Sequence, residues 1–262
     1  VGQGLVVGQV VHGHDIDVND VAFNHDGTLL ATTGDDDTAR IWDAATGEEL
    51  HAFGGAGDAW SPSFSADGSL FAARWGHEDE AVVKVLDLAT DQIVQEIPFP
   101  DASSASFDPS GERIVVSSYG RSDAVVFDVR TGQQVLTLEG HLHGLTDVAW
   151  SPDGTSIATS SYDGSARIFD GSTGRELFVL VGHGSQVWAL DWGPNSRHLV
   201  SGSADGTAKL WVFGGPAGGA RDLVTLSGQD TRRGIAGVAF SPDGTRVMIG
   251  DGPVTSTTIW DV

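Results

Sequence analysis

The sequence contains no cysteine, only one methionine and two lysines, and no long apolar run. The absence of cysteine excludes a disulfide framework, a thiolate metal site and a cysteine nucleophile. Because no stretch approaches the ~20 apolar residues of a membrane-spanning helix, we predict no membrane partner. Basic residues are also scarce, since 14 Lys and Arg face 36 Asp and Glu and give a formal net charge of −22. A surface of this charge repels phosphate backbones, so we predict no nucleic-acid partner.

The sequence is nevertheless rich enough in apolar residues to fold, because they occupy 40% of its 262 positions. A turn of the type Ser-Pro-Asp-Gly recurs six times, and each repeat closes on an aromatic or aliphatic residue, usually followed by Asp. These closing residues stand at positions 42, 86, 127, 169, 211 and 260. The regular spacing indicates six repeat units.

Within a unit the apolar pattern has a period of two. Residues 157–161, 165–169 and 175–180 are short runs rich in β-branched and small side chains, and turn residues separate them. Such runs are typical of β-strands. We therefore predict an all-β fold in which each unit contributes four antiparallel strands, named a to d in chain order.

Four-stranded units of this length resemble the blades of WD-repeat β-propellers. In that family a Gly-His pair, a Ser or Thr in strand b, a turn Asp and a strand-c Trp form a hydrogen-bonded network inside the blade. The matching residues are His183, Ser201, Asp205 and Trp211 in unit five, His14, Thr32, Asp36 and Trp42 in unit one, and His141, Thr159 and Asp163 in unit four. Unit four has Phe169 in place of the Trp, and units two, three and six lack other parts of the pattern.

The resemblance implies a single domain over residues 1–262, folded as a six-bladed propeller. The expected blades are residues 15–53, 58–97, 101–138, 144–180, 186–226 and 234–262. The last unit ends after three strands, and residues 5–11 have the pattern of the missing one. We therefore expect the N-terminal strand to complete the C-terminal blade, which would hide two sheet edges.

Catalytic and metal sites are poorly supported. The set His183, Ser201 and Asp205 has the composition of a hydrolase triad, but similar sets recur in other units and no Gly-x-Ser-x-Gly turn accompanies them. The acidic runs 35–37 and 78–80 lack the spacing of a calcium loop, and no glycine-rich phosphate loop is present. We predict no catalytic residue, no metal, no cofactor and no enzymatic activity.

Five aromatic residues are not required by the repeat pattern. Aligning the units puts Trp60 and Trp188 at the start of strand a, Trp75 in a b–c turn, and Tyr119 and Tyr162 just before the turn Asp. The resemblance implies that these positions lie on the narrow face, where propellers of this family bind partners. Tyr and Trp are enriched in binding hot spots. The alternative is that Trp60 and Trp75 fill space in a blade without the network.

Charged residues indicate which kind of partner this face would bind. Asp17 and Asp35 align near it, while Arg232 and Arg233 lie in the loop that enters the last unit. An acidic and aromatic rim would suit a partner segment rich in Arg or Lys through charge and cation–π contacts. The arginine pair could instead belong to a solvated loop.

The predicted function is a non-catalytic protein-interaction or scaffold module that binds a protein or peptide. One alternative is the C-terminal sensor domain of a larger bacterial signalling protein, such as a nucleotide-dependent switch or kinase, favoured by the missing initiator Met and the preference for Arg over Lys. An enzyme acting from the channel is disfavoured, because the strand-a residues expected there are mostly apolar: Val21, Val148, Leu190 and Val238. With no visible signal peptide we favour a cytoplasmic location. The sequence leaves the oligomeric state open.

Overall fold

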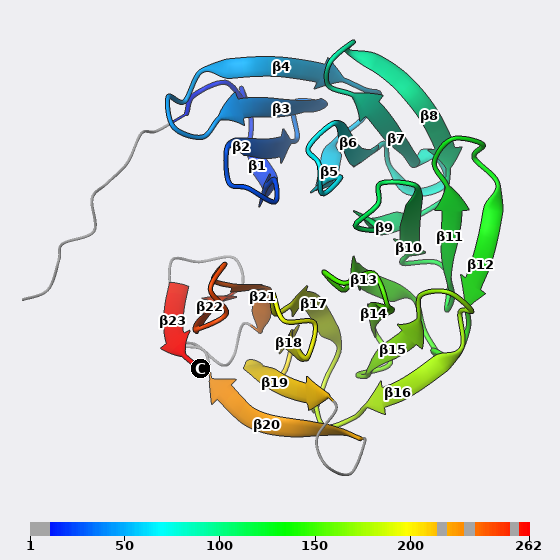
Figure 1. Ribbon diagram of the computed structural model, residues 1–262, viewed down its shortest axis with the longest axis vertical. Helices are drawn as coiled ribbons and strands as arrows, with labels where there is room; N and C mark the ends of the chain where they lie inside the picture. The colour runs from blue at the N-terminus through cyan, green and yellow to red at the C-terminus, as the bar shows by residue number, and fades with distance from the viewer. Residues whose placement is uncertain (1–10, 214–218, 228–233, 252–256) are drawn as a thin grey trace, which may run out of the picture.

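The computed structural model describes residues 11–213, 219–227, 234–251 and 257–262. Six antiparallel sheets surround a central axis, so the predicted six-bladed β-propeller is confirmed (Figure 1). The one helix in the described ranges is a single 3₁₀ turn, η1 (Glu78–Glu80). No helix among the described residues has the length and apolar character that a membrane crossing requires.

Blades 1 to 3 are regular four-stranded sheets whose strands follow chain order from the axis outward (Figure 1). Blade 1 consists of β1 (Val18–Phe23), β2 (Leu29–Gly34), β3 (Thr38–Asp43) and β4 (Glu49–Gly54). Blade 2 consists of β5 (Ala59–Phe64), β6 (Leu70–Trp75), β7 (Val82–Asp87) and β8 (Gln92–Pro98). Blade 3 consists of β9 (Ala102–Phe107), β10 (Arg113–Ser118), β11 (Ala124–Asp128) and β12 (Gln134–Leu138).

Blades 4 and 5 repeat this arrangement, and blade 6 has three described strands. Blade 4 consists of β13 (Leu145–Trp150), β14 (Ser156–Ser161), β15 (Ala166–Asp170) and β16 (Glu176–Leu180). Blade 5 consists of β17 (Val187–Trp192), β18 (His198–Ser203), β19 (Thr207–Phe213) and β20 (Ala220–Ser227). Blade 6 consists of β21 (Ile235–Phe240), β22 (Arg246–Asp251) and β23 (Thr257–Asp261). The predicted fourth strand, residues 5–11, falls almost entirely outside the described ranges, so the closure stays a prediction.

The Ser-Pro-Asp-Gly turns explain why each a–b hairpin forms where it does. In blade 4, Asp153 Oδ1 accepts hydrogen bonds from the Ser151 hydroxyl at 2.7 Å and the Thr155 backbone N–H at 3.0 Å. Gly154 follows with φ of 70°, a left-handed conformation that glycine adopts without steric cost. The turn therefore satisfies its own polar groups and fixes the register of β13 on β14.

The hydrophobic core is divided into layers, one at each of the five junctions from blade 1 to blade 6. The layer between blades 4 and 5, for example, joins Ile168 of β15 to Val187 of β17 and Trp211 of β19. Burying the apolar face of each sheet against the next blade supplies the main stabilisation, because removing apolar surface from water is worth ~25 cal/mol per Å².

A bulge near the start of the innermost strand recurs in all six blades and positions side chains at the axis. In five blades the pairing with the second strand skips one residue, and the skipped residues are Asn19, Ser103, Thr146, Trp188 and Ala236. In β5 the irregularity covers Ser61 and Pro62, and Ser61 has φ of 55°. A bulge changes the direction in which nearby side chains point. In this propeller the bulges place side chains at the starts of the innermost strands near one end of the channel.

Candidate functional site

The structure connects the network residues of blade 5 by hydrogen bonds. The His183 ring lies 3.1 Å from Asp205 through Nδ1 and 2.8 Å from the Ser201 hydroxyl through Nε2. The Trp211 Nε1–H donates to the same hydroxyl at 2.8 Å. The Ser201 side chain is thus held between the imidazole and the indole, inside the sheet.

Blade 1 contains the same arrangement, and blade 4 contains it without the indole. His14 contacts Asp36 and Thr32 at 2.8 Å each, and Trp42 Nε1–H donates to Thr32 at 2.9 Å. In blade 4 the corresponding distances are 2.8 Å from His141 to Asp163 and 2.9 Å from His141 to Thr159. Phe169 is fully buried at the strand-c position and offers no donor.

Hydrogen bonds to the carboxylate decide the protonation of these sites. Burial pushes the pKa of Asp163 upward, but bonds from the Ser165 hydroxyl, the Leu142 backbone N–H and His141 outweigh it and lower the pKa to about 2. The imidazole of His141 is almost completely covered. The hydroxyls that contact the imidazoles in blades 4 and 5, Thr159 and Ser201, are 0% exposed, so these groups hold a blade together and are not accessible to a substrate.

A separate cavity of about 290 Å³ lies on the propeller axis, where the innermost strands begin. Trp60, Tyr119 and Trp188 contribute aromatic walls, and Asp20 and Asp147 contribute carboxylates. We call these five residues the channel mouth. They come from blades 1 to 5, so the cavity exists only because the blades are arranged in a ring.

Trp188 is held in place by a contact within its own blade and by one from blade 6. Its Nε1–H donates to Gln186 Oε1 at 3.2 Å. Its ring also lies against Gly234, where an added Cβ would stand 2.7 Å from the ring. Gly234 has φ of 74°, so both its conformation and this close approach require glycine. The indole is therefore half-buried and fixed, with one face toward the cavity.

The two tyrosines form a stacked pair beside the cavity. The rings of Tyr119 and Tyr162 have centroids 5.9 Å apart and planes inclined by 22°. Both side chains are exposed. Tyr162 also borders a second depression of about 350 Å³ that includes Gln186, the hydrogen-bond partner of Trp188. Four of the five predicted aromatic residues thus lie on one continuous surface.

The two predicted polar contacts lie on the blade 1 side of this surface. Asp35 Oδ1 accepts a hydrogen bond from Asn19 Nδ2 at 2.6 Å, and Asn19 also donates to the Ala59 carbonyl, one residue before Trp60. The Asp35 backbone N–H donates to the carbonyl of Asp17. Neither carboxylate lines the cavity, so their predicted contact role would be at its rim.

The prediction for Trp75 is wrong, because its side chain is only 1% exposed. The ring lies in the core between blades 1 and 2, its Nε1–H donates to the Asp37 carbonyl at 3.2 Å, and Lys84 lies over its face. The sequence alternative, that it fills a blade without the network, describes this residue correctly. Arg232 and Arg233 lie outside the described residues.

The two carboxylates of the channel mouth were not predicted from the sequence, from which we expected a mostly apolar channel; of the apolar residues expected there, Leu190 and Val238 do line the cavity. Asp147 accepts hydrogen bonds from its neighbour Val148 at 2.8 Å and from the Leu190 N–H of the next blade at 2.9 Å. Val148 is instead buried between blades. The available signal was an Asp-Val pair at the same strand-a position in units one and four, Asp20-Val21 and Asp147-Val148.

Burial in the channel changes the protonation of these groups. Desolvation raises the pKa of Asp20 and of Asp147 to about 6, although backbone hydrogen bonds oppose the shift. Asp20 remains accessible to solvent even though the channel walls surround it. Asp191, near the other end of the channel, has a pKa raised to about 7 by the same cause.

Side chains on the innermost strands also link each blade to the next. Asp191 accepts a hydrogen bond from the Phe240 backbone N–H at 2.6 Å, and Ser106 accepts one from the Trp150 N–H at 3.3 Å. The edge of an innermost strand presents unpaired N–H groups. A polar side chain of the preceding blade satisfies them.

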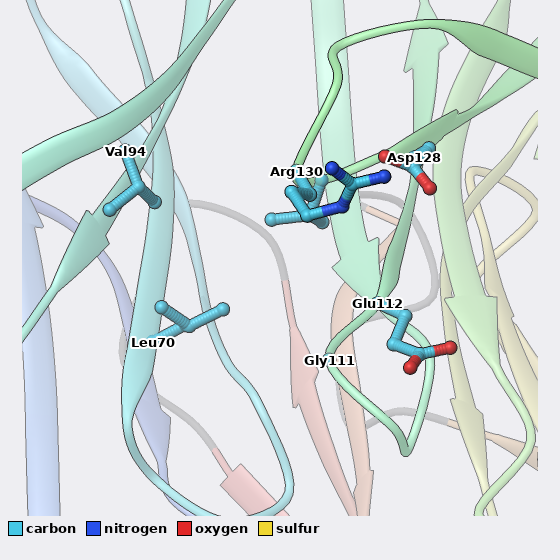
Figure 2. Close-up of a pocket in the computed structure, with 7 residues that line it drawn as sticks. Leu70, Val94, Gly111, Glu112, Asp128 and Arg130 are labelled. Atoms are coloured by element: carbon cyan, nitrogen blue, oxygen red, sulfur yellow. The ribbon is translucent and has the colours of Figure 1, made fainter.

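A larger cavity lies elsewhere, between blades 2 and 3, and has a volume of about 540 Å³. Figure 2 shows Leu70 and Val94 facing Glu112 and Arg130 across it. The Asp128 carboxylate at its edge already accepts two hydrogen bonds from Thr131 at 2.7 Å and so belongs to a turn. Without an aromatic wall or a free buried polar group, this cavity is a weaker binding candidate than the channel mouth.

In the described part of the chain, no three His, Asp or Glu side chains are grouped so that they could hold a metal ion.

A family model described as WD domain, G-beta repeat matches residues 6–43, 132–170 and 174–212. Guanine nucleotide-binding protein subunit beta-1 of Nicotiana tabacum is 29% identical over 170 residues, 60% of this chain and 44% of that protein. Eukaryotic translation initiation factor 3 subunit I of Coccidioides immitis is 32% identical over 129 residues, 47% of this chain and 37% of that protein. The matched region thus spans less than half the length of either relative. The three repeat matches and the six blades together show that the chain belongs to the WD-repeat family.

Proposed function

We propose that this propeller is a non-catalytic interaction module whose channel mouth receives a cationic side chain from a protein or peptide partner. The supporting observation is the convergence of three aromatic rings and two carboxylates on one cavity. The named relatives include subunits of larger assemblies by their own names, which agrees with a role in protein interaction.

The chemistry of the channel mouth favours Arg or Lys as the inserted residue. Two carboxylates face the cavity, and its described lining includes no cationic side chain. Aromatic faces attract cations, by ~0.5–2 kcal/mol depending on desolvation. The volume of about 290 Å³ lies just below the ~300–1,000 Å³ typical of small-molecule sites, so it suits one side chain rather than a whole ligand.

Arg74 sets a limit on where the cation can bind. Its guanidinium carbon lies 5.9 Å from the Trp60 ring centroid, and its Nη1 donates to the Gly76 carbonyl. This positive charge opposes a second cation beside Trp60. We therefore place the inserted group nearer Asp147 and Trp188.

Labelled heptapeptides Gly-Ser-Gly-X-Gly-Ser-Gly, with X as Arg, Lys, Gln or Glu, test the proposal. Binding is followed through the Trp indole N–H resonances, which report millimolar affinities. We expect the Arg and Lys peptides to bind at least ~10-fold more tightly than the Gln peptide, since one charge-assisted bond is worth ~1.5–3 kcal/mol. Trp188→Ala and Asp147→Asn should remove this preference without lowering the melting temperature.

The control variant is Arg130→Ala in the larger cavity, which should bind the peptides as the parent does. Equal affinity for all four peptides would contradict the proposal. A loss of binding that always accompanies a lower melting temperature would show that Trp188 and Asp147 are packing residues.

Two other functions were weighed. The role as a bacterial signalling sensor remains a prediction from sequence, and the relatives named above come from a plant and a fungus. Channel catalysis is less well supported, because Asp147 already accepts hydrogen bonds from Val148 and Leu190. A carboxylate committed to two backbone donors is better suited to holding a fixed charge than to moving a proton.

A further inference from the structure

Arg74 stands at a position where the other blades carry only small side chains. It is the fifth residue of β6, and the residues at the same place in the other second strands are Thr33, Ser117, Ser160, Gly202 and Gly250. Ser160, for example, is fully buried, and its hydroxyl lies 2.8 Å from that of Thr146 in the same sheet. The architecture of a blade therefore does not require a guanidinium here.

The Arg74 side chain lies at the edge of the channel mouth. Its guanidinium carbon is 5.9 Å from the ring centroid of Trp60. Burial raises the pKa of Tyr119, and the nearby positive charge of Arg74 opposes that shift. Trp60 and Tyr119 both line the cavity, whereas Arg74 does not. The charge therefore lies beside two walls of the channel mouth and outside the cavity itself.

Most of the hydrogen-bonding capacity of Arg74 is unused. A guanidinium carries five N–H donors. Nη1 of Arg74 donates to the Gly76 carbonyl at 2.9 Å, whereas Nε is buried and has no partner among the described residues. Burial lowers the pKa of Arg74, and the charge of Asp58 opposes this shift. The Asp58 carboxylate does not pair with Arg74, however, and lies 3.7 Å from Nδ1 of His77.

The ion pairs of the other arginines make this one unusual. Each of the other three partly buried arginines in the described ranges is paired with a carboxylate: Arg40 with Glu49, Arg113 with Asp108, and Arg167 with Glu176. Arg74 has no such carboxylate among the described residues. A partly buried charge with unused donors is suited to an acceptor from outside the chain.

We propose that Arg74 binds a carboxylate of the same partner segment whose cationic side chain enters the channel mouth, an inference that rests on the proposed function. The cavity holds little more than one side chain, and an extended residue spans ~3.3–3.6 Å. The partner should therefore carry Asp or Glu within two residues of its Arg or Lys. A carboxylate fits better than a phosphate, because the second negative charge of a phosphate would be repelled by Asp20, Asp58 and Asp147.

Eight peptides based on Gly-Ser-Gly-Arg-Gly-Ser-Gly test the proposal. Four carry Glu at one of the two positions on either side of the Arg, and four carry Gln at the same places. Binding is again followed through the Trp indole N–H resonances. For at least one position, we expect the Glu peptide to bind the parent ~5-fold more tightly than the matched Gln peptide. A ratio near one at all four positions would overturn the proposal.

Variants of the protein identify the group responsible. Arg74→Gln should abolish the preference for Glu, and Arg74→Lys should retain part of it, because Lys keeps the charge but not the planar fork. The matched control is Arg121→Gln, which removes the same charge two residues after Tyr119. Arg121 already donates to Asp123 at 3.0 and 2.7 Å, so this variant should keep the preference. A preference that persists in Arg74→Gln contradicts the proposal.

The peptide series also separates this inference from the proposed function. If the parent prefers Arg to Gln at the central position but gains nothing from Glu, Arg74 only packs on Trp60 and this inference alone fails. If the preference for Arg is absent, both fail. The melting temperature of each variant is measured in parallel, and a lower value with an unchanged Glu-to-Gln ratio again assigns Arg74 a packing role. Tighter binding of a phosphoserine peptide than of the Glu peptide would overturn the choice of a carboxylate.

Discussion

Blades 5 and 2 have the same four-stranded geometry but different interiors. Blade 5 buries His183, Ser201 and Trp211 in a hydrogen-bonded network. Blade 2 has no such network, yet its strand-c residue Leu86 is as fully buried as Trp211. The shape of a blade is therefore not dictated by the network.

Aromatic packing replaces the network in blade 2. Phe71 contacts Phe53 and Phe64 with ring centroids 6.3 and 5.4 Å apart. The Trp75 ring occupies the space beside Gly55, and Lys84 lies 5.3 Å from the ring centroid. Two large buried rings, Phe71 and Trp75, thus fill the interior of blade 2, whereas blade 5 combines hydrogen bonds with the buried Trp211.

Trp75→Ala should have the largest effect, because it removes the ring on which blade 2 depends. We expect the free energy of unfolding to fall by about 3–5 kcal/mol, the usual cost of truncating a buried Trp. Urea denaturation followed by circular dichroism measures the change. Trp60→Ala is the control in the same blade, and its loss should be below ~1 kcal/mol since this side chain is partly exposed. Equal losses would mean that both rings are core.

Asp205→Ala tests the other side of the comparison. The carboxylate accepts hydrogen bonds from the Thr207 hydroxyl, the Gly184 N–H and His183. Its removal takes away the acceptor that these three donors share. We expect a loss of about 2 kcal/mol in urea denaturation. Asp205→Asn keeps an acceptor oxygen and should lose roughly half as much. A neutral Asp205→Ala would show that the network is dispensable even in blade 5.

The blades also differ at the axis, where Asp191 of blade 5 takes the place of Ser63 in blade 2. Burial raises the pKa of Asp191 to about 7, well above the ordinary value of an aspartate. The folded state therefore binds the proton more tightly, so the group costs nothing at low pH and destabilises the fold increasingly as pH rises to 7.

Asp191→Asn keeps an acceptor for the Phe240 N–H but removes the charge. At pH 8 we expect the variant to exceed the parent by ~1 kcal/mol in the free energy of unfolding, and at pH 4 to equal it. Urea denaturation at the two pH values decides the matter. A constant difference across this range would mean that Asp191 titrates normally.

Phe169→Trp is expected to have the smallest effect, since it completes the network of blade 4. The indole rings of Trp42 and Trp211 lie under the Gly of their Gly-His pairs, and Gly140 stands at the same place in blade 4. A new Nε1–H could donate to Thr159. We expect thermal unfolding to show a gain below ~1 kcal/mol, and a loss would mean that the ring is overpacked.

The repeat pattern predicted the fold because each blade is encoded locally. The turn at Asp153 and Gly154 closes on its own side chains, and the run of small and β-branched residues at 157–161 forms β14, in which all five are buried. Trp75 was misassigned because position in the repeat does not reveal which way a ring turns. Asp147 was overlooked because its partner, Leu190, lies 43 residues away on another blade.

The six repeats by themselves determined that the chain folds into four-stranded blades, and the absence of cysteine that no disulfide joins them. Turn hydrogen bonds and the two-residue period of the strands depend on residues that are close in the sequence. They can therefore be predicted without knowing how the blades are arranged in the ring. Only the tertiary structure decided that Trp60, Tyr119 and Trp188 share a cavity with Asp20 and Asp147, because five blades contribute one residue each. The isolated charge of Arg74 likewise depends on the arrangement in space, since only the structure shows that no described carboxylate pairs with it while the other partly buried arginines in the described ranges are paired.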